Sequence, residues 1–344
     1  MSHPLERDLD HIVARTEKLW EELRGQRIFI TGGTGFFGCW LLESFAWANR
    51  RLGLNAEAVV LSRYADPLKS KAPHLAANDA IAFHKGDITT FDSVTGSFSH
   101  VIHAASAASA ELNREHPLIM FDTVAQGTRR TLDFALACGA RKVLLTSSGA
   151  VYGRQPPCMS HIREDYRGAP DTMEPLSAYA EGKRAAEFLC SVYGRRLGLE
   201  VKIARCFSFV GPYLPLDIHY AVGNFIADGL CERPIHVKGD GTPYRSYLYA
   251  AELTEWLWTI LFEGESLRPY NVGSSRELTV ADLAGSIAKI FGLDGNVHIA
   301  QKPEPGKEAE RYVPCVTRVE DELQLRQTVD LTEAVQKTAA WHRR

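Results

Sequence analysis

A strand, a glycine cluster and a helix are predicted to follow one another near the start of the chain, and this order restricts the fold more than any other feature. Residues 27–30, three of which are apolar, are predicted to form a short buried strand, and a helical pattern extends from about 37 to 51. Gly32, Gly35 and Gly38 stand between them in a GxxGxxG pattern. Such glycines allow a tight turn and let a pyrophosphate approach the N–H groups of a helix N-terminus. The order therefore favours a dinucleotide-binding turn over an ordinary one.

Short apolar runs and helical segments continue to alternate after this turn. Beyond Gly211 and Pro212 the alternation gives way to shorter elements, including helices at 250–262 and 280–291. The alternation predicts an α/β fold of the Rossmann type, a doubly wound parallel sheet with right-handed crossovers. Further strands are predicted at 58–61, 81–83, 101–103, 142–146 and 201–205, with helices at about 118–138 and around Tyr179.

Three regions are expected along the chain. Residues 1–24 form an N-terminal helical extension, in which one amphipathic helix covers 8–24. Residues 25–212 form the dinucleotide-binding Rossmann domain, which also contains Ser148, Tyr179 and Lys183. Residues 213–344 form a smaller mixed α/β lobe that closes over substrate, and a strand and a helix of this lobe can return to the main sheet.

Composition and residue patterns narrow the class of protein. The 344 residues are 45% hydrophobic and carry a formal net charge of -3, which fits a globular protein and argues against nucleic acid as the main partner. The 7 cysteines show no CxxC spacing and the 12 histidines no HExxH pair, so we expect reduced thiols and no bound metal. No apolar run reaches the roughly 18 residues of a membrane span. The N-terminus is charged throughout and does not resemble a signal peptide, so a soluble, cytoplasmic protein is expected.

The end of the second predicted strand bears on the choice of cofactor. An acidic residue there would bind a ribose diol, whereas a basic one accommodates a 2′-phosphate. The chain has Ser62 and Arg63 at this point and no acid until Asp66, which favours NADP(H), with NAD as the alternative. Arg63 as a solvated arginine, or one stacked on adenine, is the competing interpretation.

Two further strand ends point toward the same cofactor. Asp87 follows the third strand, where it either accepts from the adenine amino group or forms a turn after Gly86; both interpretations stay open. His103, Ala104 and Ala105 end the fourth strand, and the two small alanines leave room for a cofactor. We expect His103 to be packed or cofactor-adjacent rather than an acid–base group.

Tyr179 and Lys183 lie one helical turn apart and therefore share a helix face. An ammonium group there can lower the pKa of the phenol and anchor a ribose hydroxyl, so that the phenol exchanges a proton with a substrate alcohol. A hydroxyl such as that of Ser148 would hold this alcohol in place. Beside a nicotinamide, these groups predict hydride transfer at a carbinol carbon.

Taken in order, the glycine pattern, the His103 segment, Thr146-Ser-Ser148 and the Tyr179/Lys183 pair resemble the extended short-chain dehydrogenase/reductase family. The resemblance is nearest to its nucleotide-sugar epimerases, 4-ketoreductases, decarboxylases and 4,6-dehydratases, and it covers about residues 25–335. Further matching segments are Ala204–Pro212, Asn224–Phe225, Gly239–Ser246 and Tyr270–Gly273.

The resemblance implies a role for each residue of the catalytic set. Tyr179 would be the general acid/base, Lys183 would bind the nicotinamide ribose, and Ser148 would hydrogen-bond the reacting sugar oxygen, with Ser147 as the less favoured hydroxyl. Further cofactor contacts implied by the resemblance are Phe36, Phe37, Ile88 and Thr123.

The residues after Ser148 help to choose the reaction. In related 4,6-dehydratases an acidic pair follows the catalytic hydroxyl, and UDP-glucuronate decarboxylases usually keep a Glu there. This chain has Gly149 and Ala150, which disfavours both reactions. Reduction of a 4-keto sugar by NADPH is then favoured, and a 4-epimerase that retains its NAD(P) is the alternative. A non-catalytic NADP-binding regulator is a third possibility, against which the intact Ser148, Tyr179 and Lys183 argue.

Substrate contacts are also implied by the resemblance. Arg245 and Arg311 would bind the nucleotide diphosphate, because arginine suits phosphate by bidentate geometry; either could instead be a surface arginine paired with an acid. Asn224 would contact the sugar–phosphate region, or else cap a helix. The family's usual asparagines are replaced here by Ser208 and Thr123.

A homodimer is expected, because family members commonly pair the helix after the fourth strand with the Tyr179 helix. The competing interpretation is that the apolar residues of these helices only face their own sheet. The candidate interface residues are Leu118, Val124, Leu132, Leu136, Ala185, Phe188 and Leu189.

Overall fold

In the computed structural model the described residues are 3–64, 66–92, 94–106, 109–218 and 220–344. Their contacts divide them into two units. The first unit consists of the described residues within 1–153, 169–205 and 254–270, and the second of those within 154–168, 206–253 and 271–344. The domain boundary expected at residue 212 stays a prediction, but the chain enters the first unit again after that point.

The first unit is built on a seven-stranded sheet in the order β11-β6-β5-β4-β1-β2-β3. The pairs β1/β2, β2/β3, β1/β4 and β4/β5 are parallel. The order from β3 to β6 is that of a Rossmann sheet, so the predicted fold class is confirmed. The strands are β1 Arg27–Thr31, β2 Glu57–Ser62, β3 Ile81–Lys85, β4 His100–His103, β5 Lys142–Ser148, β6 Glu200–Cys206 and β11 Pro269–Val272.

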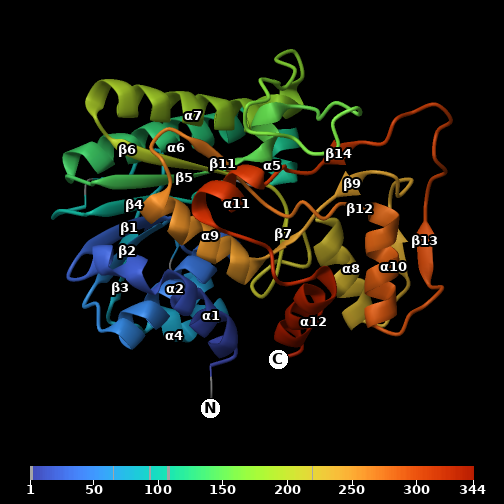
Figure 1. The fold of residues 1–344 in the computed structure, drawn as a ribbon, viewed down its shortest axis with the longest axis horizontal. Helices are drawn as coiled ribbons and strands as arrows, with labels where there is room; N and C mark the ends of the chain where they lie inside the picture. Colours follow the sequence, from blue (N-terminus) through green and yellow to red (C-terminus); the bar gives the residue numbers. More distant parts are fainter. Residues whose placement is uncertain (1–2, 65, 93, 107–108, 219) are drawn as a thin grey trace. The chain divides into compact units, whose positions relative to one another are not determined.

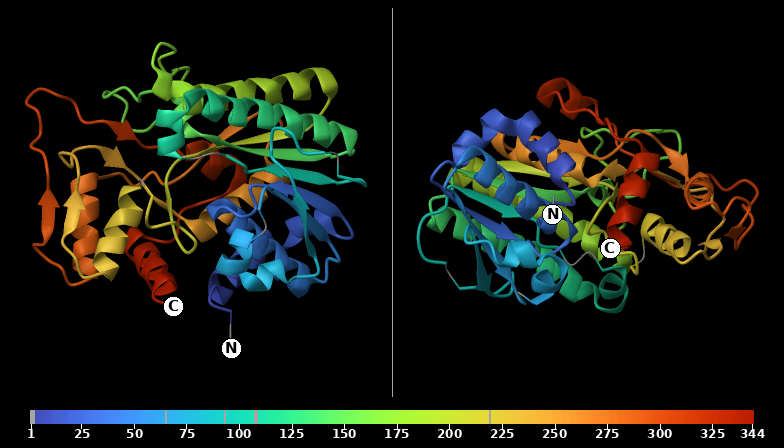
Figure 2. Two further views of the ribbon diagram at one scale, coloured as in Figure 1. Left: turned by 180° about the vertical axis from the view of Figure 1, so that it is seen from behind. Right: turned by 90° about the horizontal axis from the view of Figure 1, so that it is seen from below.

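Helices cover both faces of this sheet. Figures 1 and 2 show α6 and α7 (green) on one face, and α1 and α2 (blue) on the other. The helices of the first unit are α1 Glu6–Thr16, α2 Phe36–Leu52, α3 Asp66–Lys71, α4 Pro73–Ala76, α5 Ala110–Glu115, α6 Pro117–Ala137, α7 Ala178–Leu197 and most of α9 Ala250–Glu263, with 3-10 turns η1 Glu17–Leu23, η2 Gly149–Tyr152 and η3 Pro175–Ser177.

The core beneath α6 and α7 follows from the two-residue period of the strands. Phe29 lies opposite Val59 on one side and Val101 on the other, and Val101 lies opposite Val143. These four side chains form one row across the sheet and belong to a single buried cluster with α6 and α7. The cluster fixes α7, and hence Tyr179 and Lys183, against the sheet.

The prediction of a single α-helix over residues 8–24 is wrong, because the helix type changes within this segment. An α-helix ends at Thr16 and a 3-10 turn continues to Leu23. The Thr16 hydroxyl donates to the Ile12 carbonyl at 2.6 Å and accepts from the Trp20 indole at 2.8 Å. A threonine that bonds back to the preceding turn competes with the regular helical pattern. This accounts for the change at Thr16.

The second unit contains short elements, as the loss of periodicity beyond residue 212 predicts. Its small sheets pair β7 with β10, β9 with β12 and β14, and β8 with β13. None of the helices in the described part of the chain is long and apolar enough to cross a membrane. The remaining elements are β7 Phe209–Val210, α8 Ala221–Leu230, β8 Ile235–Val237, β9 Tyr244–Arg245, β10 Leu248–Tyr249, β12 Leu278–Thr279, α10 Val280–Ile290, β13 Val297–Ile299, β14 Arg311–Tyr312, α11 Thr317–Leu323 and α12 Leu331–His342.

Candidate active site

The glycine turn between β1 and α2 has no room for side chains at two of its positions. Gly32 has a φ of 75°, and a Cβ there would come within 2.6 Å of the Ala104 backbone. A Cβ at Gly38 would lie 2.3 Å from the Gly32 carbonyl oxygen. Gly35 precedes α2, whose first turn has no side-chain cap and no acidic residue. The turn therefore suits an anion such as a pyrophosphate, as predicted for a dinucleotide site.

Phe36 and Phe37 are the first two residues of α2 and lie at the same helix N-terminus. Their ring centroids are 5.8 Å apart. Thr123 lies on α6 and is half-buried. The assignment of these three residues to the cofactor stays a prediction.

The residues at the ends of β2 and β3 lie near one another. Ser62 ends β2 opposite Lys85, and its hydroxyl donates to the Tyr64 carbonyl at 2.7 Å. Arg63 follows it and is exposed. The pKa of Asp87 is lowered, chiefly because the Thr89 hydroxyl donates to its carboxylate at 2.6 Å and less because of the positive charge of Arg63. Arg63 is thus close enough to Asp87 for its charge to act there.

Asp87 adopts the turn-forming role that the sequence left open. Its carboxylate also accepts from the Thr89 backbone N–H at 2.9 Å, which is an Asx turn. That Asp87 also contacts the adenine of the cofactor stays a prediction. Ile88 is buried in the core cluster, where its side chain lies against Gly127.

His103 is held at the end of β4 by two threonines. Its Nδ1 lies 2.8 Å from the Thr31 hydroxyl and its Nε2 3.0 Å from the Thr128 hydroxyl. Burial, with a smaller effect of the Lys183 charge, lowers the pKa of His103 to about 3. His103 is therefore neutral near pH 7, which fits a packed histidine better than an acid–base group.

Thr31 also positions the residues that follow His103. Its hydroxyl accepts from the Ala105 N–H at 3.1 Å, and its carbonyl accepts from the Ala104 N–H at 3.2 Å. The two alanines are thus fixed beside Gly32. Sequence reasoning did not single out Thr31, although its place between a strand and the glycine turn marks it.

Ser148, Tyr179 and Lys183 come from β5 and α7. The Lys183 ammonium is buried and donates to the Thr146 carbonyl of β5 at 2.7 Å. Its Nζ lies 5.8 Å from the centroid of the Tyr179 ring. The Ser148 hydroxyl, at the end of β5, accepts from the Ala150 N–H at 3.1 Å. Lys183 thereby brings the face of α7 that carries Tyr179 to the strand that carries Ser148.

A half-buried ion pair continues the same helix face one turn beyond Lys183. Glu187 accepts two hydrogen bonds from the Arg205 guanidinium at 3.0 and 2.7 Å. It also accepts from the Ser147 hydroxyl at 2.5 Å, and Arg205 donates to the Tyr152 hydroxyl at 2.9 Å. Burial acts to lower the pKa of Arg205, but the hydrogen bond and charge of Glu187 outweigh it, and the pKa is raised. The network links α7 to β5 through Ser147 and to β6 through Arg205.

Asn113 of α5 supports the N-terminus of α7. Its side-chain oxygen accepts from the Tyr179 backbone N–H at 3.0 Å, and its amide nitrogen donates to the Leu176 carbonyl at 2.7 Å. Ser177, at the helix N-cap position, makes no side-chain cap. Sequence reasoning missed Asn113, because the bond joins residues 66 positions apart.

The other candidate substrate residues, apart from Ser148, belong to the second unit. Arg311 contacts Glu277 at 2.5 Å, and its guanidinium lies 4.0 Å from the centroid of the Tyr244 ring. Arg245 is on the neighbouring strand, donates to the Tyr244 carbonyl at 2.8 Å and lies 3.7 Å from Glu310. Both arginines thus have acidic neighbours, and their assignment to a diphosphate stays a prediction.

Asn224 does not cap a helix, so this alternative is wrong. The N-cap of α8 is Tyr220, and Asn224 lies inside the first turns. With its amide nitrogen turned toward them, it donates to the carbonyls of Leu216 and Ile218 at 3.1 and 2.9 Å. Ser208 is half-buried, and its carbonyl accepts from the Leu248 N–H at 3.1 Å.

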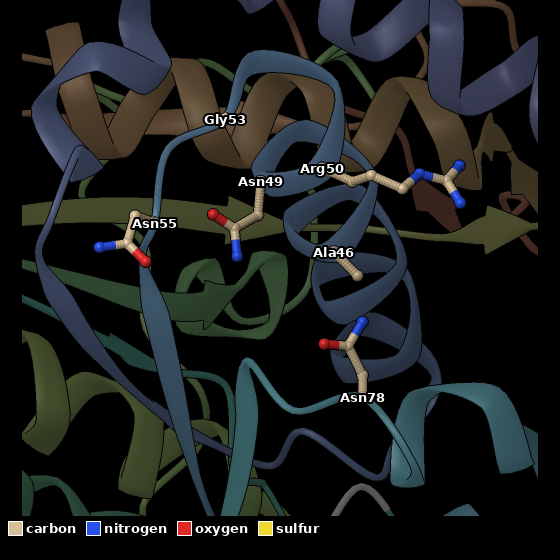
Figure 3. Close-up of a pocket in the computed structure, with 6 residues that line it drawn as sticks. All are labelled: Ala46, Asn49, Arg50, Gly53, Asn55 and Asn78. Carbon is tan, nitrogen blue, oxygen red and sulfur yellow. The ribbon is translucent and has the colours of Figure 1, made fainter.

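A pocket of about 470 Å³ lies in the first unit, at the C-terminal end of α2 (Figure 3). Asn49 in its wall exchanges two hydrogen bonds of 3.0 Å with the backbone of Ala56. Since parallel sheets bind ligands at the carboxyl ends of their strands, a pocket beside the start of β2 is not the cofactor site. Its lining residues are Ala46, Asn49, Arg50, Gly53, Asn55 and Asn78.

Comparison with known protein families gives a match over residues 28–273 to the NAD dependent epimerase/dehydratase family. The chain belongs to this family. It is therefore an enzyme, and its cofactor is a nicotinamide dinucleotide, as the sequence resemblance predicted. The uncapped glycine turn before α2 is consistent with that cofactor.

One curated relative is UDP-glucuronic acid decarboxylase 1 of Arabidopsis thaliana, which is 31% identical over 90% of this chain and 68% of its own length. Among solved structures, UDP-glucose 4-epimerase of Thermus thermophilus in complex with NAD is 26% identical, with a TM-score of 0.74 over 92% of this chain and 99% of that one. A dTDP-glucose 4,6-dehydratase of Streptomyces venezuelae with NAD bound has 24% identity and a TM-score of 0.78, over 92% and 97% of the two chains. The family thus spans several reactions on nucleotide sugars.

Proposed function

We propose that this enzyme performs hydride transfer at C4 of a nucleotide-diphosphate sugar, and that it reduces a 4-keto group with NADPH. The main support is the buried Lys183 ammonium, bonded to the β5 strand and placed beside the ring of Tyr179. A cation in this position stabilises a phenolate, which is the form that Tyr179 reaches after giving up its proton.

In this proposal, residues of the first unit bind the cofactor and transfer the proton. The bound nicotinamide supplies or accepts the hydride. The glycine turn and the N-terminus of α2 hold the pyrophosphate, and Lys183 holds a ribose hydroxyl. Tyr179 gives its phenolic proton to the sugar O4 as the carbonyl is reduced, while Ser148 donates a hydrogen bond to the same oxygen.

The turn after Ser148 supports simple reduction of the sugar rather than dehydration or decarboxylation. Gly149 and Ala150 form the start of η2 and carry no acid, and the Ala150 N–H is bonded to Ser148. The Arabidopsis relative is named a decarboxylase. At 31% identity the likeness supports a shared family, and the local residues bear more directly on the reaction.

A second candidate is a 4-epimerase that keeps its cofactor and returns the hydride to the other face of C4. The 26% identity to a solved UDP-glucose 4-epimerase favours it. Against it stands Arg63, which follows β2 where a 2′-phosphate is recognised and so favours an exchangeable NADPH.

The remaining parts of the proposal concern substrate, assembly and compartment. Arg245 and Arg311 supply positive charge for the diphosphate, and Asn224 and Ser208 contact the sugar–phosphate region. The protein forms a homodimer through α6 and α7 and acts in the cytoplasm. All 7 cysteines are free thiols, which is compatible with a reducing compartment.

Turnover assays with each cofactor test the reaction. We expect NADPH to be consumed in proportion to reduction of a 4-keto sugar nucleotide, and Tyr179→Phe to lower kcat by about 10²–10⁴-fold. Tyr193→Phe, on the same helix but bonded to Asp133, is the matched control and should retain activity.

Two results would contradict the reductase proposal. Interconversion of sugar epimers without net cofactor consumption would establish the epimerase instead. Release of CO₂ from UDP-glucuronate would establish a decarboxylase, despite Gly149 and Ala150.

A further inference from the structure

Three side chains of the first unit, distant in sequence, converge with their ligand-type atoms facing one another. His3 precedes α1, Glu43 lies on α2 and His74 lies on α4. The two Nε2 atoms are 3.3 Å apart. The Glu43 carboxylate lies 3.3 Å from His3 Nε2 and 2.9 Å from His74 Nε2.

These separations are those of three ligands on one metal ion. Zinc binds histidine nitrogen at about 2.0–2.1 Å and carboxylate oxygen at about 2.0–2.2 Å, so a tetrahedral angle separates neighbouring ligand atoms by about 3.3 Å. Two neutral imidazoles and one carboxylate are also a ligand set that zinc prefers. We propose that His3, Glu43 and His74 bind Zn²⁺, with water completing the tetrahedron.

The position of Glu43 supports a site rather than a chance surface cluster. Its side chain is only 3% exposed, whereas that of His74 is 45% exposed. A buried carboxylate requires compensation by cations or hydrogen bonds. The side chains of His3 and His74 are 20% and 45% exposed, so an ion can reach the cluster from solvent.

Packing around His3 also favours a fixed position. Its ring lies 5.7 Å from that of Trp47, and Trp47 donates to Asp10 of α1 at 2.8 Å. The Leu5 N–H donates to His3 Nδ1 at 3.2 Å. When His3 binds zinc through Nε2, its Nδ1 carries the ring proton and can no longer accept this hydrogen bond. This bond must therefore break, but one backbone hydrogen bond contributes little beside the binding free energy of a structural zinc ion.

The site would be structural. It joins the segment before α1 to α2 and α4, and its three ligands belong to neither the glycine turn nor the Tyr179 face. The histidine spacing predicts no bound metal, because the sequence contains no HExxH pair. The structure supplies a site that no short motif encodes, because His3 and His74 are 71 residues apart.

Zinc binding to the tag-free, chelator-treated full chain tests the proposal. We expect one Zn²⁺ per chain after dialysis against ZnCl₂, a zinc-dependent rise in Tm, and the visible d–d absorption of tetrahedral Co²⁺ when CoCl₂ replaces zinc. His74→Ala should weaken zinc binding at least about tenfold and abolish the Tm rise. Because His74 is half-exposed, this variant should fold.

Glu43→Gln keeps the size of the side chain and removes its charge, so it should also lose zinc. His84→Ala, on β3 and outside the cluster, is the control and should bind one zinc ion as the unaltered chain does. Failure of the unaltered chain to bind stoichiometric zinc would overturn the proposal. Equal zinc affinity in His74→Ala and the unaltered chain would also overturn it.

Discussion

At the scale of single residues, the site depends on charges held by a few fixed partners. Lys183 is 2% exposed, and an ammonium group so buried costs several kcal/mol unless it is hydrogen-bonded. The Thr146 carbonyl supplies one such bond. Arg63 is the opposite case, since it is exposed and its guanidinium can reorient toward a ligand.

Arg63→Ala tests the assignment of the cofactor. A charge-assisted hydrogen bond to phosphate contributes about 1.5–3 kcal/mol, so we expect the KM for NADPH to rise about 10- to 100-fold. The KM for NADH, which lacks the 2′-phosphate, should change little. Steady-state kinetics with both cofactors measures the two effects. An equal change for both would remove Arg63 from phosphate recognition.

At the scale of elements, α7 carries Tyr179 and Lys183 and is held in place at two points, its first turn and its middle. Glu187 and Arg205 hold its middle against β5 and β6. Asn113 holds its first turn, where N–H groups have no partner within the helix. Asn113 is a positioning residue, because it acts on the backbone of Tyr179 and not on a ligand.

Asn113→Ala should therefore lower kcat about tenfold with little change in the KM for cofactor, since a small displacement of Tyr179 costs rate more than binding. Asn113→Asp keeps the oxygen that accepts from the Tyr179 N–H and should restore part of the rate. Comparing kcat and KM across the three proteins measures this. A kcat unchanged in Asn113→Ala would show that α7 needs no such support.

At the scale of the whole molecule, α6 and α7 present large apolar side chains to solvent. Leu118 is 79% exposed and Phe188 66%, whereas Val124 and Leu132 of the candidate interface are buried in the core. The competing interpretation, that these residues only face their own sheet, thus applies to the second pair and not to the first. Exposed apolar residues on two adjacent helices are typical of an interaction surface.

Phe188→Glu should convert the proposed dimer into a monomer, because a charge buried in an apolar interface is strongly unfavourable. Light scattering after size-exclusion chromatography measures the mass. Met173→Glu, at a residue 86% exposed outside these helices, is the control and should remain dimeric. A monomeric unaltered chain would refute the dimer.

Much of the fold could be predicted because its determinants are local. The six strands predicted from short apolar runs are all present, each within two residues of its predicted bounds. The helix over 8–24 was less accurate, since the Thr16 side chain bonds to its own preceding turn. The alternative that Asn224 caps a helix is also wrong, because the N-cap residue of α8 is Tyr220.

The sequence by itself determined the Rossmann order, the glycine turn and the pairing of Tyr179 with Lys183, because spacing along a strand, turn or helix fixes which side chains share a face. Only the tertiary structure decided what holds those groups in place. Asn113, the Glu187–Arg205 pair and the cluster of His3, Glu43 and His74 each join segments that folding brings together. Contacts of this kind leave no periodic signal in the chain.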